Sequence, residues 1–152
     1  MLTLITLVQF TVFFGYVYYI YNRYGKLTSI SASSDYLPRK ERWKFAAFLC
    51  IVGTLNVFQE MGMYGVLAMA GLWYSGITLR HGVKKSSSYY VHIIGTVGAI
   101  VATFLGLWVL HGMWLPTITL AVAIALLYRD KYFIWWVEII AMMLVISAYL
   151  LR

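Results

Sequence analysis

The chain has 152 residues, of which 62% are hydrophobic and only 11% are charged, and its formal net charge is +7. Soluble domains carry about 25% charged residues, so this composition excludes a water-soluble globular protein and indicates a membrane protein. A net positive charge can also indicate nucleic-acid binding, but here the basic residues lie in short runs between long apolar segments, as in membrane-protein loops. We therefore expect an all-α integral membrane protein whose partners include membrane lipids and no nucleic acid.

Six apolar segments follow one another along the chain, at about 2–21, 43–59, 61–79, 89–110, 114–128 and 132–151. A helix needs about 20 residues to cross the hydrocarbon layer, with a lower limit near 17. The fifth segment has only about 15 residues, so it either crosses a locally thinned bilayer or forms a re-entrant helix. Every loop but the first is too short to fold separately. We predict a single transmembrane domain, residues 1–152, folded as a compact bundle of six transmembrane helices.

The basic residues predict how this bundle is threaded. Lys and Arg are enriched in the cytoplasmic loops of membrane proteins. Eleven of the 12 basic residues lie in the first, third and fifth loops, at 23–44, 80–85 and 129–131, and the twelfth is Arg152. Alternate loops of a six-span bundle face the same side, so we expect these three loops in the cytoplasm and both termini outside.

Two ionisable residues are predicted at similar depth inside the bundle. Glu138 lies roughly 10 Å from the cytoplasmic end of the sixth span, and His92 lies at a comparable depth in the fourth. An ionisable side chain inside a membrane is costly, so it normally has a functional or a pairing role. We expect Glu138 and His92 to line a polar pocket on the cytoplasmic side. A structural hydrogen bond between them, joining the fourth and sixth helices, is the alternative.

The first cytoplasmic loop, KLTSISASSDYLPRKERWKF, has two parts. Its basic second part holds the loop beside anionic lipid headgroups. The first part, SISASSDY, is not needed for the topology, since any polar linker would serve. It lies on the same side of the membrane as His92 and Glu138, so we expect it to form a lid or wall of the pocket, with Ser31, Asp35 and Tyr36 as binding residues.

A second polar group is predicted near the outer face, made of Asn56, Gln59, Glu60 and His111. Asn56 and Glu60 are one helical turn apart and share a face. The group either forms the mouth of a path or caps a helical hairpin at the lipid headgroups. Gln9 lies in the middle of the first span, between the cytoplasmic-side pocket and this outer group, and is the strongly polar residue there.

Small residues recur at about one-turn spacing on the third and fourth spans. They are Ala68, Gly71 and Ser75 on the third span and Gly98, Ala102 and Gly106 on the fourth. Because lipid gives helices no hydrophobic reason to associate, such residues let two backbones approach and pack closely. The pattern predicts a compact bundle and not a particular function.

The three histidines, His81, His92 and His111, raise the question of a metal site. His92 and His111 lie on one predicted helix, about 28 Å apart along its axis, so they cannot bind one ion. There is no metal-ligand spacing such as HExxH, no GxSxG and no phosphate-binding or dinucleotide motif. We therefore expect neither a metal nor another cofactor.

Two segments, SISASSDY and WWVEIIAMML, resemble small polytopic membrane proteins of bacteria and phages with an SIS…Y loop after the first span. This resemblance implies a bacterial inner (cytoplasmic) membrane. The loop is also similar to the ISDTG…PE…F signature of the six-span autophagy-modulator and GPI-remodelling proteins, whose positions are taken here by Ile30, Ser31, Asp35, Pro38, Glu41 and Phe45. A fainter likeness, to the alkaline ceramidase and progestin-receptor superfamily, implies a Ser, an Asp and three His around zinc, which the histidine spacing argues against.

Several functions remain open, and we favour a non-enzymatic one. The cytoplasmic-side pocket binds a ligand, a lipid headgroup or an ion, or else the bundle acts as an assembly or interaction factor, as a homo-oligomer or with another membrane protein. The next alternative is a transporter or channel subunit whose path runs through Gln9 and Asn56. The last is a lipid-directed hydrolase with His92 or Glu138 as general base.

Overall fold

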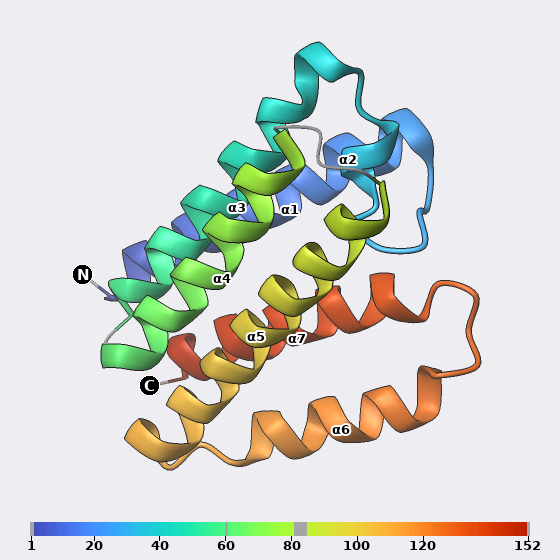
Figure 1. Ribbon diagram of the computed structural model, residues 1–152. Helices are drawn as coiled ribbons and strands as arrows, with labels where there is room; N and C mark the ends of the chain where they lie inside the picture. The colour runs from blue at the N-terminus through green and yellow to red at the C-terminus, as the bar shows by residue number, and fades with distance from the viewer. Residues whose placement is uncertain (1, 60, 81–84, 152) are drawn as a thin grey trace.

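The computed structural model describes residues 2–59, 61–80 and 85–151, with only the backbone described at 78–80, 85–89 and 91–93. Within these residues every regular element is a helix and there is no β-strand, which confirms the all-α fold class. In chain order the elements are α1 (Leu2–Tyr24), α2 (Ser33–Tyr36), the 3₁₀ turn η1 (Arg39–Glu41), α3 (Arg42–Val57), α4 (Gly62–Arg80), α5 (Lys85–His111), α6 (Leu115–Leu127) and α7 (Phe133–Leu150) (Figure 1).

Each of the six predicted apolar segments forms one of the long helices, with ends within about four residues of those expected. Glycines end two of them. Gly25 and Gly112 follow α1 and α5 with φ of 73° and 64°, and their N–H groups donate to the carbonyls of Tyr21 at 2.8 Å and Trp108 at 2.9 Å. A left-handed residue in this position closes a helix, and glycine adopts it without strain. Proline in the first turn of α6 costs no hydrogen bond there.

Among the described residues, three helical stretches are long and apolar enough to cross a membrane: Leu2–Tyr24, Ile94–His111 and Phe133–Leu150. This agrees with the expected membrane protein. α6 is apolar as well, but its 13 residues cover only about 20 Å.

Five helices surround a common interior. α3 lies between α1 and α4, α5 packs along α4, and α7 contacts both α5 and α1, which closes the ring (Figure 1). α6 packs on the outside, mainly against α7, and Leu120 is its one buried residue. The short fifth helix is therefore peripheral to the interior that the other long helices enclose.

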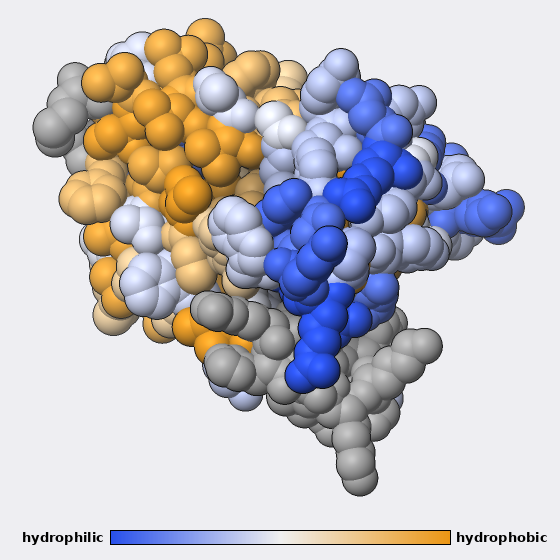
Figure 2. Space-filling view, turned by 90° about the horizontal axis from the view of Figure 1, so that it is seen from above, coloured by the Kyte–Doolittle hydropathy of each residue, from blue (hydrophilic) through white to orange (hydrophobic). Residues whose placement is uncertain are grey.

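The two ends of the bundle differ in what they carry. Both chain termini and the α3–α4 and α5–α6 turns lie at one end, whereas the α1–α3 and α6–α7 connections lie at the other (Figure 1). Seen from above, hydrophilic residues gather on one part of the surface beside a broad hydrophobic area (Figure 2). These connections at the second end, together with the helix turns that adjoin them, hold most of the described basic residues.

Small residues allow α4 and α5 to touch, as the sequence predicts. A Cβ atom added at Gly95 would meet Ser75 Oγ and would lie 2.6 Å from the Gly71 carbonyl oxygen. Gly106 likewise faces Met61 and Tyr64. The prediction is not met at every position, because Gly98 has no neighbour within 4 Å of its Cβ direction.

The segment between α1 and α3 is more ordered than the predicted loop. It forms α2 and η1, and it turns back into the bundle so that Ile30, Ser33 and Leu37 are almost wholly buried. The Tyr16 hydroxyl, on α1, hydrogen-bonds to Ser33 Oγ at 2.8 Å, and the Tyr16 ring stacks on Phe48 of α3 with centroids 4.2 Å apart. These tertiary contacts hold a helix of only four residues, which would not be stable by itself.

Candidate functional site

The interior holds a cavity of about 90 Å³, to which α1, α3, α4, α5, α7 and the first loop all contribute. This is several times the roughly 10–15 Å³ that one water molecule needs on the same measure. Its walls are mostly apolar, with Phe13, Phe45, Phe48, Leu49, Val52 and Phe104 prominent among them. The polar lining residues are Ser31, Asn56, Thr96, Thr103 and Glu138.

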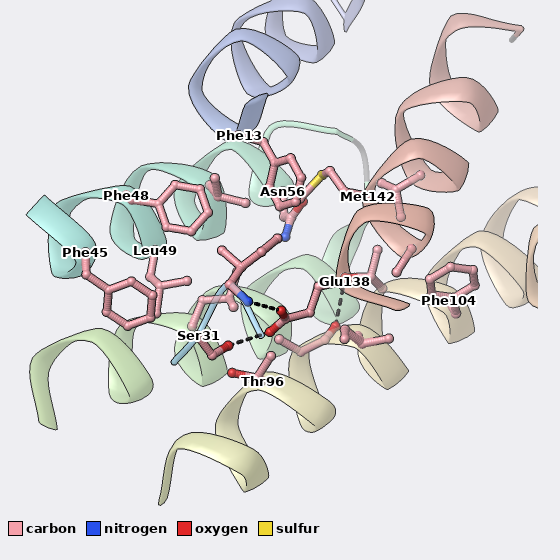
Figure 3. A pocket seen from close by; sticks show the side chains of 18 residues that line it. Phe13, Ser31, Phe45, Phe48, Leu49, Asn56, Thr96, Phe104, Glu138 and Met142 are labelled. Carbon is pink, nitrogen blue, oxygen red and sulfur yellow. Dashed lines mark hydrogen bonds between the residues drawn. The ribbon is translucent and has the colours of Figure 1, made fainter. Parts of the chain in front are cut away.

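Glu138, on α7, lies at the end of the cavity that the first loop covers (Figure 3). Its Oε1 accepts a hydrogen bond from Ser31 Oγ at 2.5 Å, and its Oε2 accepts one from the Ile30 backbone N–H at 2.5 Å. Both carboxyl oxygens therefore accept hydrogen bonds from the first loop. Among the described residues, no Lys or Arg forms an ion pair with Glu138.

The serines of the first loop satisfy the backbone where it enters the bundle. Ser29 Oγ accepts from the Ala32 N–H at 2.9 Å, and Ser34 Oγ donates to the Ser31 carbonyl at 3.2 Å. The Thr28 carbonyl accepts from the Trp135 N–H of α7 at 3.2 Å. Polar groups away from water must be paired, so the serine-rich sequence is explained by the burial of this loop.

A chain of buried amides continues from the other end of the cavity. Gln9 Nε2, on α1, donates to Asn56 Oδ1 of α3 at 2.7 Å. Gln59 Nε2 donates to Gln9 Oε1 at 2.5 Å and lies 3.5 Å from Thr6 Oγ1. All four side chains are at least 95% buried. Asn56 lines the cavity, so this chain connects the cavity to the end of the bundle that carries the termini.

The structure brings some of the predicted pocket residues together and leaves others apart. Ser31 and Glu138 are in direct contact, as described above. Asp35 and Tyr36 are exposed on the outer side of α2 and do not line the cavity; the Tyr36 ring lies 6.0 Å from that of Tyr24. His92 lies on α5 one turn before Thr96, a cavity residue, but its side chain is outside the described part of the structure.

The predicted outer group is divided in the same way. Asn56 and Gln59 belong to the buried amide chain. His111, at the end of α5, instead packs edge-to-face on Tyr149 of α7, with centroids 6.2 Å apart. Glu60 lies outside the described residues.

A separate charged cluster lies at the basic end of the bundle. Glu41 accepts hydrogen bonds from Arg23 at 2.6 Å, from Lys44 at 2.9 Å and from the Tyr19 hydroxyl at 2.9 Å. These donors, Arg23 foremost, lower the pKa of the Glu41 carboxyl to about 2. The cluster ties the end of α1 to the start of α3, and it uses Lys44, one of the basic residues that the sequence assigns to lipid headgroups.

Among the described residues, no group of three or more His, Cys, Asp or Glu side chains could hold a metal ion. The Ser31–Glu138 pair places a hydroxyl against a carboxylate base, but the nearby Ile30 N–H donates to Glu138 and so does not face an empty position where a reacting oxyanion could be stabilised. The arrangement is suited to binding a group that carries positive charge or hydrogen-bond donors.

Sequence reasoning missed several contributors to this site. Ile30 contributes its backbone N–H, which every residue but proline has, so the residue type does not reveal it. Thr6 looks like any hydroxyl residue in an apolar span. The apolar walls are missed because phenylalanine is common in membrane helices. Gln9 is the exception, since a lone amide in a span is costly and signals a buried partner.

Comparison with known proteins gives no relative: no family model, no curated protein and no solved structure matches the chain.

Proposed function

We propose that this protein binds a small amphiphilic amine within its helix bundle, with Glu138 as the counter-charge. The observation that carries the proposal is a carboxylate that lines a mostly apolar cavity and pairs with no described cation. A buried charge without an opposite charge is costly, and a cationic ligand removes that cost. The apolar walls match the hydrocarbon part of such a ligand, as in most small-molecule sites.

The proposal includes the setting of the site. We propose six spans in a bacterial inner membrane, with the basic loops in the cytoplasm and both termini outside. The grouping of both termini with the α3–α4 and α5–α6 turns at one end supports this arrangement (Figure 1), as does the positive charge of the loops. The Glu138 end of the cavity then lies toward the cytoplasm.

The test is binding of heptylamine to the protein in nanodiscs, measured by isothermal titration calorimetry against empty nanodiscs. We expect saturable binding at one site and at least tenfold weaker binding by Glu138→Gln, which removes the charge but keeps the shape. Glu41→Gln removes a carboxylate outside the cavity and should leave the affinity unchanged. Equal affinity for the wild type and Glu138→Gln would refute the proposal.

Transport is the second candidate, and the buried amide chain favours it. The chain Asn56–Gln9–Gln59 extends from the cavity toward the opposite end of the bundle, so a solute that leaves Glu138 has polar groups along a path. The permanently charged heptyltrimethylammonium ion does not cross lipid readily, so its uptake into proteoliposomes measures transport. Uptake above that of empty liposomes, reduced by Gln9→Leu, would establish transport; binding without uptake would exclude it.

A further inference from the structure

We infer that the ligand also carries a hydrogen-bond acceptor at the end remote from its amine, and that the side-chain amide of Asn56 is the donor that receives it. The inference rests on the proposed function and adds the second polar contact of the same cavity. It specifies the ligand class as a short ω-functionalised amine, with a carbonyl, ester, ether or nitrile at its far end.

The donor is visible in the geometry of Asn56. This side chain is 5% exposed and lines the cavity, and it points into the cavity from the α3 wall (Figure 3). Its Oδ1 already accepts from Gln9 Nε2 at 2.7 Å. The hydrogen bonds of the described residues include none from its Nδ2, and this NH₂ faces the mostly apolar cavity. A donor without an acceptor in an apolar space is unfavourable, and a ligand acceptor would supply the partner.

The orientation of the Asn56 amide depends on its neighbours, because either end of an amide can occupy either position. Thr6 fixes the direction. While its hydroxyl donates to the Leu2 carbonyl at 3.0 Å, Thr6 Oγ1 is left to accept from the amide group of Gln59 that faces it at 3.5 Å. That group must be the Gln59 NH₂, which is then also the donor to Gln9.

The other hydrogen bonds of the buried amide chain then have the same donor-to-acceptor direction. Gln9 accepts from Gln59 through Oε1, and so its NH₂ is the group that faces Asn56. Asn56 must therefore present its oxygen to Gln9 and its NH₂ to the cavity. If all three side-chain amides were flipped while Thr6 donates to Leu2, Gln59 Oε1 would face Thr6 Oγ1 with no hydrogen between them. Thr6, Gln59 and Gln9 thus act as positioning residues for one donor.

The length of the cavity along α7 limits the length of the ligand. On α7 the lining residues run from Glu138 to Val145, which is about 10 Å along the helix axis. An amine and an acceptor separated by a chain of five or so methylenes span a similar distance.

The experiment compares ω-aminonitriles of three to seven methylenes with alkylamines of equal heavy-atom count, for example 6-aminohexanenitrile with heptylamine. The nitrile nitrogen accepts a hydrogen bond and donates none. At the best chain length we expect the wild type in nanodiscs to bind the aminonitrile about fivefold more tightly than its alkylamine, as one net hydrogen bond allows.

Variants separate the donor from its positioning. Asn56→Leu has nearly the same shape and should abolish the preference for the nitrile over the alkylamine. Thr6→Val removes the group that fixes the direction of the chain, so both amide orientations are populated and the preference should fall by roughly half. Thr11→Val is the matched control, because Thr11 makes the same hydroxyl-to-carbonyl bond within α1, to Leu7 at 2.9 Å, outside the amide chain. It should leave the preference unchanged.

The outcomes distinguish the two proposals. If heptylamine binds in a Glu138-dependent way but no aminonitrile binds more tightly than its alkylamine, the inference about Asn56 is wrong and the proposed function stands. A nitrile preference that survives Asn56→Leu also overturns the inference. If neither probe binds the wild type, the proposed function fails and the inference fails with it.

Discussion

Glu138 shows how one residue can organise a loop and a cavity at once. Its two oxygens hold Ser31 and the Ile30 N–H, so the carboxylate fixes the first loop over the end of the cavity. A ligand amine would approach the same carboxylate. Binding and loop position are therefore coupled through one side chain, and a ligand that takes over a carboxylate oxygen weakens the attachment of the loop.

A second carboxylate, Glu41, predicts how stability depends on pH. Its pKa is about 2 in the folded protein, against an ordinary value of 4.5, because Arg23, Lys44 and Tyr19 stabilise the charged form. A carboxyl with a depressed pKa stabilises the fold above its ordinary pKa, and this contribution is lost as the pH falls from about 4.5 toward 2.

We therefore expect the thermal unfolding midpoint of the detergent-solubilised protein to fall between pH 6 and pH 3. In Glu41→Gln the fall should be smaller, since the charge that is lost on acidification is already absent. An equal fall in both proteins would show that Glu41 does not contribute.

At the scale of the elements, the α4–α5 contact depends most on small residues, because the two backbones approach closely there. Gly95→Ala should destabilise the protein by about 1–3 kcal/mol, because the added methyl group overlaps Ser75 Oγ and the Gly71 carbonyl and the two helices must separate. Gly98→Ala is the matched control on the same helix, with no neighbour within 4 Å. It should be neutral or slightly stabilising, since alanine favours a helix over glycine. Thermal unfolding of both variants measures the difference, and equal effects would contradict the packing described.

The long helices could be predicted from the sequence and the short ones could not. Apolar runs bounded by glycine, proline and charge mark α1 and α3 to α7 directly. α2 and η1 have no such signal, because they are held by tertiary contacts such as the Tyr16–Ser33 hydrogen bond. Of the segment SISASSDY, which the sequence predicts as a wall of the site, Ile30 and Ser31 line the cavity, whereas Asp35 and Tyr36 are exposed and do not.

At the same scale, spacing along a helix gives a residue's depth but not its partner. Glu138 could be placed near one end of the bundle and Asn56 near the other. Their actual partners, Ser31 and Gln9, depend on how the helices are rotated about their axes, which low amphipathicity leaves undetermined in a membrane protein.

For the whole molecule, the proposed six-span arrangement predicts the sidedness of the loops. In a Cys50→Ala background, single cysteines replace Lys40, Met113 and Lys131, and an impermeant maleimide is applied to spheroplasts. We expect Met113→Cys to react from outside, and Lys40→Cys and Lys131→Cys to react only after lysis. If α1, α5 and α7 alone crossed the membrane, Lys131→Cys would react together with Met113→Cys and not with Lys40→Cys.

The architecture also assigns different roles to the helices. Five of the long helices line the cavity, and α6, which does not, presents its apolar side chains outward. A ligand held in the interior therefore contacts α3, α5 and α7, whereas a ligand dissolved in the surrounding lipid meets α6.

Because α6 does not line the cavity, photolabelling can test most directly whether an amphiphilic amine binds inside the bundle. An alkylamine with a diazirine in its chain is photolysed with the protein in nanodiscs, and the adducts are mapped by mass spectrometry. We expect adducts on cavity residues such as Leu49, Val52 and Ala141, which excess heptylamine suppresses and Glu138→Gln abolishes. Adducts confined to outward-facing residues of α6, such as Leu126, and insensitive to heptylamine would contradict it.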